Sequence, residues 1–212
     1  MLTLLTESRG VVGASASRAR RGSRVVVEPM HTLRVTLEER VGAELLRLRD
    51  SEVETARLRL TARLDALASA GKALRWARAL LPPLVREPHA WVALVELLDK
   101  LDAPVAVDPT SALATAGLQL VEAAGWGFEL RACVRCGAPC PEARAGHFDP
   151  RRGGLVCRAC GAARRVLSGA ERVAIEAARD GGLDLPSIEL ATDVVAWIDA
   201  ALEAHAMVAP RA

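Results

Sequence analysis

Aromatic residues are scarce in this chain of 212 residues, which has no tyrosine, two phenylalanines and four tryptophans. None of them precedes Trp76. Proteins that grip single-stranded nucleic acid usually stack bases on aromatic rings. A nucleic-acid site before Trp76 would therefore depend on contacts between arginine and phosphate, with little sequence preference and a steep dependence on salt.

Several catalytic motifs are also missing. The sequence has no G-x-x-x-x-G-K-[ST] phosphate loop, no H-E-x-x-H motif and no G-x-S-x-G motif. No cysteine has an evident base as its partner in the sequence. We therefore expect a binding protein rather than an enzyme.

Long apolar runs are absent as well. No uninterrupted run approaches the roughly 20 residues that span a bilayer. Residues 1–6 are apolar, but they are few and no basic region precedes them, so they do not resemble a secretion signal. We expect a cytoplasmic protein whose cysteines stay reduced.

Four of the five cysteines form two C-x-x-C pairs, each followed by glycine, in CVRCG at 133–137 and CRACG at 157–161. The 20 residues between the pairs lie at the upper edge of zinc-ribbon spacing. Each pair aims two thiolates at one point, and the glycine permits the positive φ of such a turn. We predict one structural Zn²⁺, closed to substrate, with four ligands: Cys133, Cys136, Cys157 and Cys160.

Other interpretations of the cysteines were weighed against zinc. Two disulfides need an oxidising compartment, and a thioredoxin-like site has one C-x-x-C within a βαβ pattern. An iron–sulfur cluster also uses four cysteines and stays open as an alternative. We expect the fifth cysteine, Cys140, to be a free thiol beside the site. If Cys140 served as a ligand in place of Cys136, the first pair would lose its C-x-x-C geometry.

The formal net charge of +2 is unevenly distributed. Residues 1–24 carry five arginines and one acid, and residues 131–165 carry eight arginines and two acids. Two such segments suggest a polyanionic partner. The candidate DNA-binding residues are Arg9, Arg18, Arg20, Arg21 and Arg24. A second group, with pairing to the acidic C-terminal helices as its alternative role, comprises Arg151, Arg152, Arg164 and Arg165.

Hydrophobic periodicity predicts an α+β chain. Short apolar runs at 2–6 and 11–17, and alternation over 33–38, predict four or five strands in a small barrel or sandwich. A helix over 43–60 is an alternative there. We expect a β-rich DNA-binding domain over residues 1–57 and a helical domain over 58–212, with the zinc-binding segment 131–165 inserted.

The helical part has clear start and stop signals. Helical spacing begins near Leu58, is interrupted at Gly71 and stops at two prolines. Pro88, Asp108 with Pro109, and a capping box at Ser168 each predict a helix start. A last helix is expected from about residue 188 to 205. Core positions are expected for Trp76, Trp91 and Trp197.

Four features in this order resemble the RecO family of bacterial recombination-mediator DNA repair proteins: LTLLTESRGVVGASASRARRGS at 2–23, the helical stretch after it, GWGFELRACVRCG at 125–137 and FDPRRGGLVCRACG at 148–161. The resemblance implies an N-terminal OB fold, a helical domain and a zinc-binding segment. It also implies a nucleoid-associated protein that binds single- and double-stranded DNA, anneals complementary strands and helps to load RecA onto DNA coated by single-stranded DNA-binding protein.

The resemblance further implies two protein partners, RecR and the acidic tail of the single-stranded DNA-binding protein. It places the zinc ligands at the four cysteines named above and a basic DNA-binding segment at Arg18, Arg20 and Arg21. We expect the tail to bind an apolar groove edged by arginine in the helical part, near Arg75, Arg78 and Arg86 with Leu74, Leu80 and Leu84.

The chain departs from the family pattern at its start. Family members normally begin earlier, with a strand before the LLT strand, so we expect the first strand of the OB barrel to be missing here or the start codon to be placed too late. A barrel without that strand would expose an edge. Two other functions remain alternatives: a zinc-ribbon scaffold that joins proteins without touching nucleic acid, and a thiol oxidoreductase.

Overall fold

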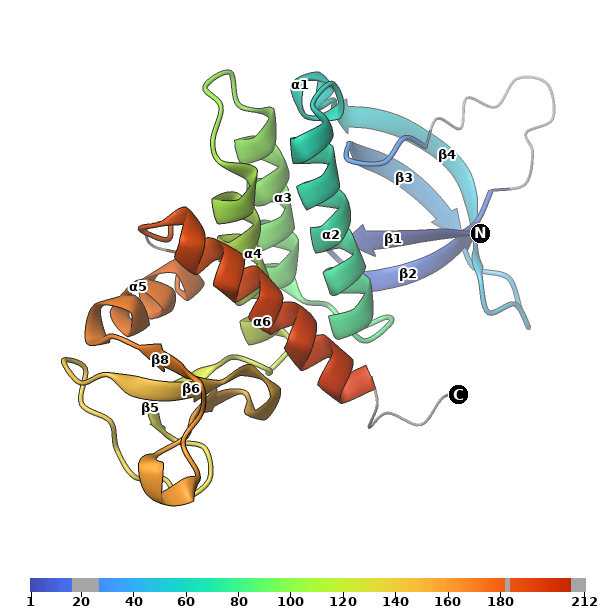
Figure 1. The fold of residues 1–212 in the computed structure, drawn as a ribbon. Coiled ribbons are helices and arrows are strands. Elements are labelled where there is room, and N and C mark those ends of the chain that lie inside the picture. Colours follow the sequence, from blue (N-terminus) through green and yellow to red (C-terminus); the bar gives the residue numbers. More distant parts are fainter. Residues whose placement is uncertain (17–26, 182–183, 207–212) are drawn as a thin grey trace. The chain divides into compact units, whose positions relative to one another are not determined.

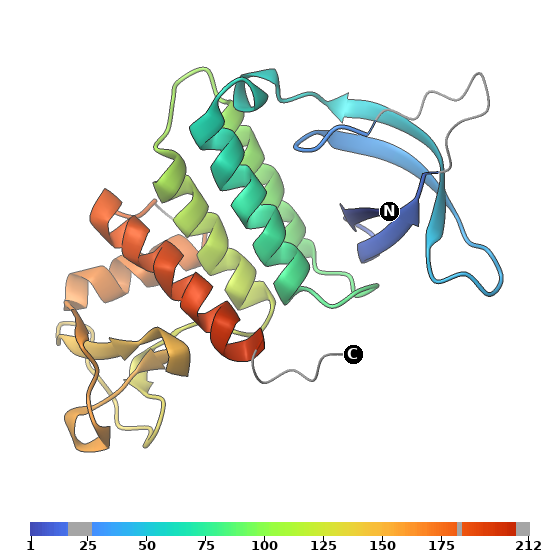
Figure 2. The same cartoon turned by 45° about the vertical axis from the view of Figure 1, so that its right-hand side comes forward.

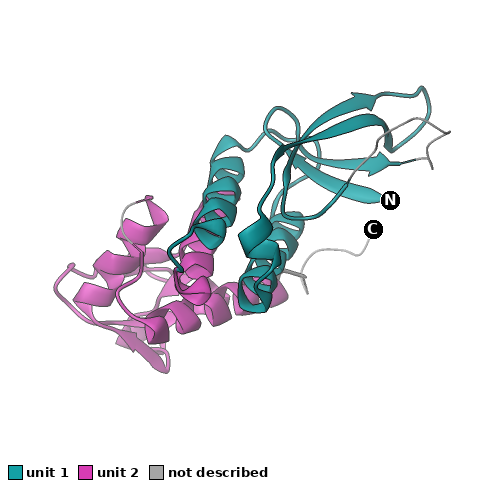
Figure 3. Ribbon diagram, turned by 90° about the horizontal axis from the view of Figure 1, so that it is seen from above, with its two compact units in different colours: residues 1–106 teal, residues 107–212 magenta. Residues whose placement is uncertain are grey.

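The computed structural model describes residues 1–16, 27–181 and 184–206. The chain divides into two compact units, Met1–Ala106 and Val107–Ala212 (Figure 3). Each unit combines a four-stranded sheet with α-helices. The α+β class predicted from the sequence is therefore confirmed. None of the described helices combines the length and apolar character that crossing a membrane requires.

The sheet of the first unit has the order β1-β2-β4-β3, and Figure 1 labels its four strands. Its strands are β1 (Leu2–Thr6), β2 (Gly10–Ser15), β3 (Thr32–Glu38) and β4 (Leu46–Thr55). β1 pairs with β2 and β3 pairs with β4, both antiparallel. Among the described residues, the two hairpins join where Ala14 and Ser15 run parallel to Leu46 and Arg47. Among the described residues the sheet stays open, so the predicted barrel is not closed.

The segment 43–60 forms mainly a strand, not the helix considered as an alternative. β4 spans ten residues within it, Leu46–Thr55. Its pairing with β3 extends from Arg47 to Thr55 and includes two register irregularities. Leucines at 45, 46 and 48 fit the spacing of a helix as well as that of a strand. Pairing with β3, which is distant in sequence, favours the strand.

The helices of the first unit lie side by side (Figure 2). They are α1 (Leu58–Thr61), α2 (Leu64–Leu80) and α3 (Pro88–Asp102). α2 buries mainly alanines, which let neighbouring backbones approach closely, and α3 buries leucines and alanines. Gly71 lies inside α2 and does not interrupt it, so that expectation was wrong. The predicted start at Pro88 is confirmed.

The loop after α2 packs against the sheet at one glycine. The backbone N–H of Leu84 donates to the carbonyl of Val11 over 2.9 Å. Gly10 has a φ of +67°, and a Cβ at that position would lie 1.8 Å from the carbonyl oxygen of Val85. Any side chain at position 10 would therefore push this loop away from β2.

A buried arginine joins the sheet to the helices. Arg57, between β4 and α1, is 1% exposed. Its Nε donates to Oδ1 of Asp99 over 2.9 Å, and its Nη1 donates to Oγ1 of Thr32 over 2.9 Å and to the carbonyl of Met30 over 3.3 Å. One side chain thus satisfies acceptors from α3, β3 and the loop before β3. The sequence did not single it out.

We expect Arg57→Ala to lower the free energy of unfolding of the first unit by about 3 kcal/mol, because it removes a buried side chain together with its hydrogen bonds to three elements. Urea denaturation followed by circular dichroism measures the loss. The matched control is Arg59→Ala on the exposed face of α1, which should change stability by no more than about 0.5 kcal/mol. Equal effects of the two substitutions would contradict the structural role of Arg57.

The second unit contains three α-helices and a sheet of short strands. The helices are α4 (Pro109–Ala123), α5 (Gly169–Arg179) and α6 (Ile188–Ala206). The sheet has the order β5-β7-β6-β8, built from β5 (Glu129–Cys133), β6 (Gly146–Asp149), β7 (Gly154–Leu155) and β8 (Arg165–Leu167). Two 3₁₀ turns accompany it, η1 (Pro150–Arg152) and η2 (Arg158–Cys160).

The predicted helix starts of this unit are confirmed in atomic detail. The Asp108 carboxylate accepts from the backbone N–H of Ser111 over 2.7 Å at the start of α4. Ser168 and Glu171 form the reciprocal capping box of α5. These short-range signals work because the partners lie within one helical turn.

Aromatic contacts pack the sheet onto α6. Phe148 of β6 lies 5.2 Å from Phe128 and 4.6 Å from Trp197, measured between ring centroids. Phe148 is 1% exposed and Trp197 is 7% exposed. Trp76 in the first unit is also buried, whereas Trp91 is half-buried. The few aromatics among the described residues thus serve mainly the cores.

Candidate metal centre

The two C-x-x-C pairs form two tight turns in the second unit. The first knuckle (residues 133–137) follows the end of β5, and the second knuckle (residues 157–161) contains η2. Gly137 has a φ of +72° and Gly161 a φ of +105°. Both glycines therefore adopt the left-handed conformation predicted for them, which lets each chain turn back behind its sulfurs.

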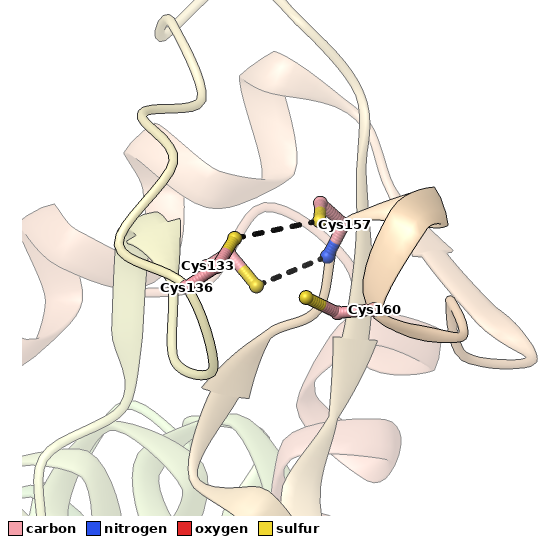
Figure 4. A group of neighbouring side chains, drawn as sticks. All are labelled: Cys133, Cys136, Cys157 and Cys160. Carbon is pink, nitrogen blue, oxygen red and sulfur yellow. Dashed lines mark hydrogen bonds between the residues drawn. The ribbon is translucent and has the colours of Figure 1, made fainter.

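The four cysteine sulfurs converge on one point. The Sγ atoms of Cys133, Cys136, Cys157 and Cys160 all lie within 4.8 Å of one another (Figure 4). The Sγ atoms of Cys136 and Cys157 are 3.7 Å apart. A tetrahedral site with Zn–S bonds of about 2.3 Å needs sulfurs separated by about 3.8 Å. The four sulfurs can hold a metal ion.

Hydrogen bonds connect the knuckles to each other. The backbone N–H of Cys157 donates to Sγ of Cys133 over 3.3 Å (Figure 4). In the opposite direction, Nη1 of Arg135 in the first knuckle donates to the carbonyl of Cys160 over 3.0 Å. Protein contacts therefore help to set the distance between the two pairs.

The electrostatics of the thiols favour a cation among them. The N–H donated by Cys157, with those of Arg135 and Cys136, lowers the pKa of Cys133 to about 6. Hydrogen bonds with the Cys157 and Cys136 sulfurs raise the pKa of Cys160 to about 12. Cys133 is thus a thiolate at neutral pH, while Cys160 keeps its proton unless positive charge offsets its neighbours. A divalent ion supplies that charge.

The fifth cysteine lies outside this group. All five cysteines are free of disulfide bonds. Cys140 is half-buried, and its sulfur accepts from Nη1 of Arg172 over 3.3 Å. His147, the histidine nearest the knuckles in sequence, places Nδ1 2.9 Å from the carbonyl oxygen of Ala163. Neither residue belongs to the cluster of four sulfurs.

Arg172 of α5 supports the metal centre from behind. Its side chain is buried, with 2% exposure. Nε donates to the carbonyl of Leu130 over 2.7 Å, and Nη1 donates to the carbonyls of Pro141 over 2.8 Å and Arg144 over 2.7 Å. Nη2 donates to the carbonyls of Leu130 and Cys140. One guanidinium thus fixes both β5 and the loop after the first knuckle.

Sequence reasoning missed Arg172, although a signal was present. Arg172, Ile175 and Ala178 recur at three-residue spacing, and all three are buried in α5. An arginine on the apolar stripe of an amphipathic helix indicates a buried guanidinium with carbonyl or carboxylate acceptors. The acceptors themselves lie some 30 to 40 positions away in the chain, so no local pattern identifies them.

Of the five candidate DNA-binding arginines in the first unit, only Arg9 lies among the described residues. Arg18, Arg20, Arg21 and Arg24 lie outside the described residues. Arg9 is described, and its side chain is 48% exposed and pairs with Glu39 over 2.6 Å. Its guanidinium is thus accessible but already next to a carboxylate.

The second group of arginines divides between two environments. Arg165 pairs with Glu171 over 2.9 Å and with Asp193 over 3.0 Å, both on the C-terminal helices. Arg152 pairs with Asp149 over 3.4 Å. Arg151 and Arg164 are exposed. Pairing with the acidic C-terminal helices, the alternative role considered for this group, is therefore observed for Arg165.

Comparisons with known proteins agree with these features. The family model described as "Recombination protein O C terminal" matches residues 61–206. A protein of Anaeromyxobacter sp. (strain K) named DNA repair protein RecO is 36% identical over 191 residues, covering 86% of this chain and 73% of that protein. A protein of the same name from Anaeromyxobacter sp. (strain Fw109-5) is 37% identical over 186 residues, covering 84% and 69%.

Replacing Cys157 by serine should remove the metal, because three sulfurs and a hydroxyl hold Zn²⁺ far more weakly than four thiolates. Metal analysis of the purified chain by mass spectrometry measures bound zinc per chain. The control is Cys140→Ser, which removes a thiol outside the cluster and should leave the metal content unchanged. Metal loss from the control variant would show that the ligands have been assigned wrongly.

Replacing Arg172 by methionine should lower the free energy of unfolding of the second unit by about 3 kcal/mol, since the buried carbonyl of Leu130 and the part-buried carbonyls of three loop residues lose their donor. It should also speed zinc transfer to a chromogenic chelator, because the loop after the first knuckle loses its support. Arg131→Met is the control: Arg131 is exposed and paired with Glu176, and such pairs contribute about 1 kcal/mol or less. If Arg172→Met released zinc at the same rate as the parent chain, Arg172 would not support the metal centre as proposed.

Proposed function

The chain belongs to the RecO family, and on that premise we propose that it is a DNA repair protein. In this proposal it binds single- and double-stranded DNA, anneals complementary strands and assists the loading of RecA onto DNA coated by single-stranded DNA-binding protein. The main support is the extent of the family match, which covers 86% of the chain at 36% identity.

We further propose that the metal centre holds one structural Zn²⁺. All four donors are cysteine sulfurs, the soft ligands that suit zinc in a tetrahedral site. Four protein ligands leave no position for water or substrate, so the ion stabilises the fold and does not activate a reactant. This agrees with the expectation that the chain binds DNA without acting as an enzyme.

The open sheet of the first unit fits an OB-type domain. Such folds are five-stranded, partly open barrels whose surface binds oligonucleotides. The four described strands leave β1 and β3 as the two edges, and one strand paired with both edges would close the sheet. The DNA-binding domain proposed for residues 1–57 lies within the first compact unit, and segment 131–165 lies within the second.

DNA contact is assigned first to the basic segment of residues 9–24. It carries five arginines and no acid, and the first aromatic residue of the chain comes only at Trp76. Binding should therefore depend on phosphate contacts rather than on base stacking.

RecR and the acidic tail of the single-stranded DNA-binding protein are the proposed protein partners. For the tail, Arg75 and Arg78 are exposed on α2. Leu84 lines a hollow of about 370 Å³ together with Arg9 and Arg40. Its lining also contains Glu39 and Glu44, so an acidic peptide would have to place its carboxylates at the two arginines.

A scaffold without nucleic-acid binding is the second candidate function. The observation that favours it is the internal pairing of several cations of segment 131–165: Arg131 with Glu176, Arg152 with Asp149, and Arg165 with Glu171 and Asp193. The two candidates differ in one measurable property, the affinity for DNA.

The deciding measurement is a titration of labelled single-stranded DNA with the full zinc-loaded chain at two salt concentrations. We expect binding that weakens steeply with salt, with a slope of about −0.7 in log K against log salt per phosphate neutralised. Reversing Arg18, Arg20 and Arg21 to glutamate should abolish it, because three attractive contacts become repulsive.

A triple control keeps the change in net charge equal. Arg59, Arg75 and Arg78 are exposed on α1 and α2, and their reversal to glutamate should leave most of the affinity. A parent chain that binds no DNA at low salt would favour the scaffold. Equal losses in both triple variants would show that net charge matters and the basic segment does not.

A further inference from the structure

A hollow of about 420 Å³ lies beside the metal centre in the second unit. Its charged and titratable lining, apart from cysteines, consists of Arg144, His147 and Arg158, and none of the described residues that line it is an acid. Positive side chains around a hollow without a carboxylate favour an anion. The larger hollow beside α5, of about 650 Å³, differs in having Glu142 and Asp184 in its lining.

The ion pairs of segment 131–165 leave these arginines available. Arg131, Arg152 and Arg165 each have a carboxylate partner within 3.4 Å. Arg144 and Arg158 are exposed, and within the described part of the chain neither forms an ion pair. Two of the charges that are not offset locally, those of Arg144 and Arg158, therefore line the same hollow.

Each of these three side chains, Arg144, His147 and Arg158, is held by a different support. The Arg144 carbonyl accepts from Nη1 of Arg172 over 2.7 Å, which fixes its loop. Arg158 lies in η2, between two metal ligands. His147 belongs to β6, and its Nδ1 donates to the carbonyl of Ala163 over 2.9 Å, because a carbonyl can only accept. Fixed supports reduce the ordering cost of binding.

The formal charge of the whole segment also favours an anion. Residues 131–165 carry eight arginines and two acids. Four thiolates with one Zn²⁺ contribute −2, so the segment keeps a net charge of about +4 with the metal bound. The metal cluster therefore offsets only part of the positive charge.

We propose that this hollow is a phosphate-binding site, and that Arg144 and Arg158 hold the sugar–phosphate backbone of DNA there, beside His147. Arginine binds phosphate oxygens through paired N–H donors. The inference rests on the proposed DNA-binding function and extends it to a second contact, on the metal-binding segment and separate from the basic segment near the N-terminus.

The test compares two double variants of the full zinc-loaded chain. Arg144→Ala with Arg158→Ala should weaken binding of labelled single-stranded DNA roughly tenfold at low salt and reduce the salt slope by about one to two units. The control, Arg131→Ala with Arg152→Ala, removes the same charge from the same segment, but from arginines that are already paired. It should leave affinity and slope near those of the parent.

Zinc content and unfolding temperature are measured on every variant, so that a fold defect is recognised. If Arg144→Ala with Arg158→Ala lost zinc while binding DNA like the parent, these arginines would serve only to balance the thiolates and the inference would be overturned. Equal losses of affinity in the two double variants would also overturn it, because general charge would then explain the effect.

A competition experiment distinguishes binding of the DNA backbone from binding of a free nucleotide. A deoxynucleoside monophosphate competes with the labelled oligonucleotide, and we expect competition only at a large excess, because one phosphate makes few of the contacts. Competition at equal phosphate concentration would point to a nucleotide site and overturn the backbone assignment. A parent chain that binds no DNA would overturn the proposed function itself, whereas unchanged binding by Arg144→Ala with Arg158→Ala would overturn this inference alone.

Discussion

Four thiol groups within 4.8 Å of one another cannot all ionise unless a cation lies among them, because thiolates repel each other. The surrounding structure depends on this constraint. β7 has two residues, β8 three and β6 four, so the sheet has few hydrogen bonds and little core of its own. In small segments of this kind, the free energy of binding a metal would become free energy of folding. Arg135 and Arg158 lie inside the two knuckles, so a bound ion would also help to fix their positions.

In both units, a buried arginine satisfies hydrogen-bond acceptors that the regular secondary structure leaves without a donor. Arg57 satisfies acceptors where β4 gives way to helices, and Arg172 satisfies carbonyls of β5 and the loop after the first knuckle. Loops that leave short strands carry carbonyls without ladder partners, and burial without a donor costs about 1–3 kcal/mol for each. A guanidinium has five N–H donors in one plane, so it serves several such carbonyls at once. Leucine at either position would fill the space and leave these acceptors unsatisfied.

The sequence predicted best what depends on neighbours in the chain. Caps at Asp108 and Ser168, the helix start at Pro88, and glycines after each C-x-x-C pair all act within one turn, and the structure has them. Gly71 was misjudged, because buried packing of α2 outweighs the roughly 1 kcal/mol that glycine costs in a helix. The length of β4 and the open sheet depend on pairing between distant strands. The acceptors of Arg172 are equally distant in sequence, so neither could be read from local patterns.

The distribution of arginines connects the metal centre to the proposed function. Within one segment, Arg165 is directed to acids of the C-terminal helices and stabilises the unit, while Arg144 and Arg158 remain exposed around a hollow. If the chain binds DNA as proposed, its few aromatic rings leave little scope for stacking, so the affinity would come from several phosphate contacts. Contacts on two linked segments would reinforce each other, because binding at one raises the effective concentration of DNA at the other. Moderate affinity at each segment would then suffice, and each contact would stay readily reversible, which suits the proposed annealing of two strands.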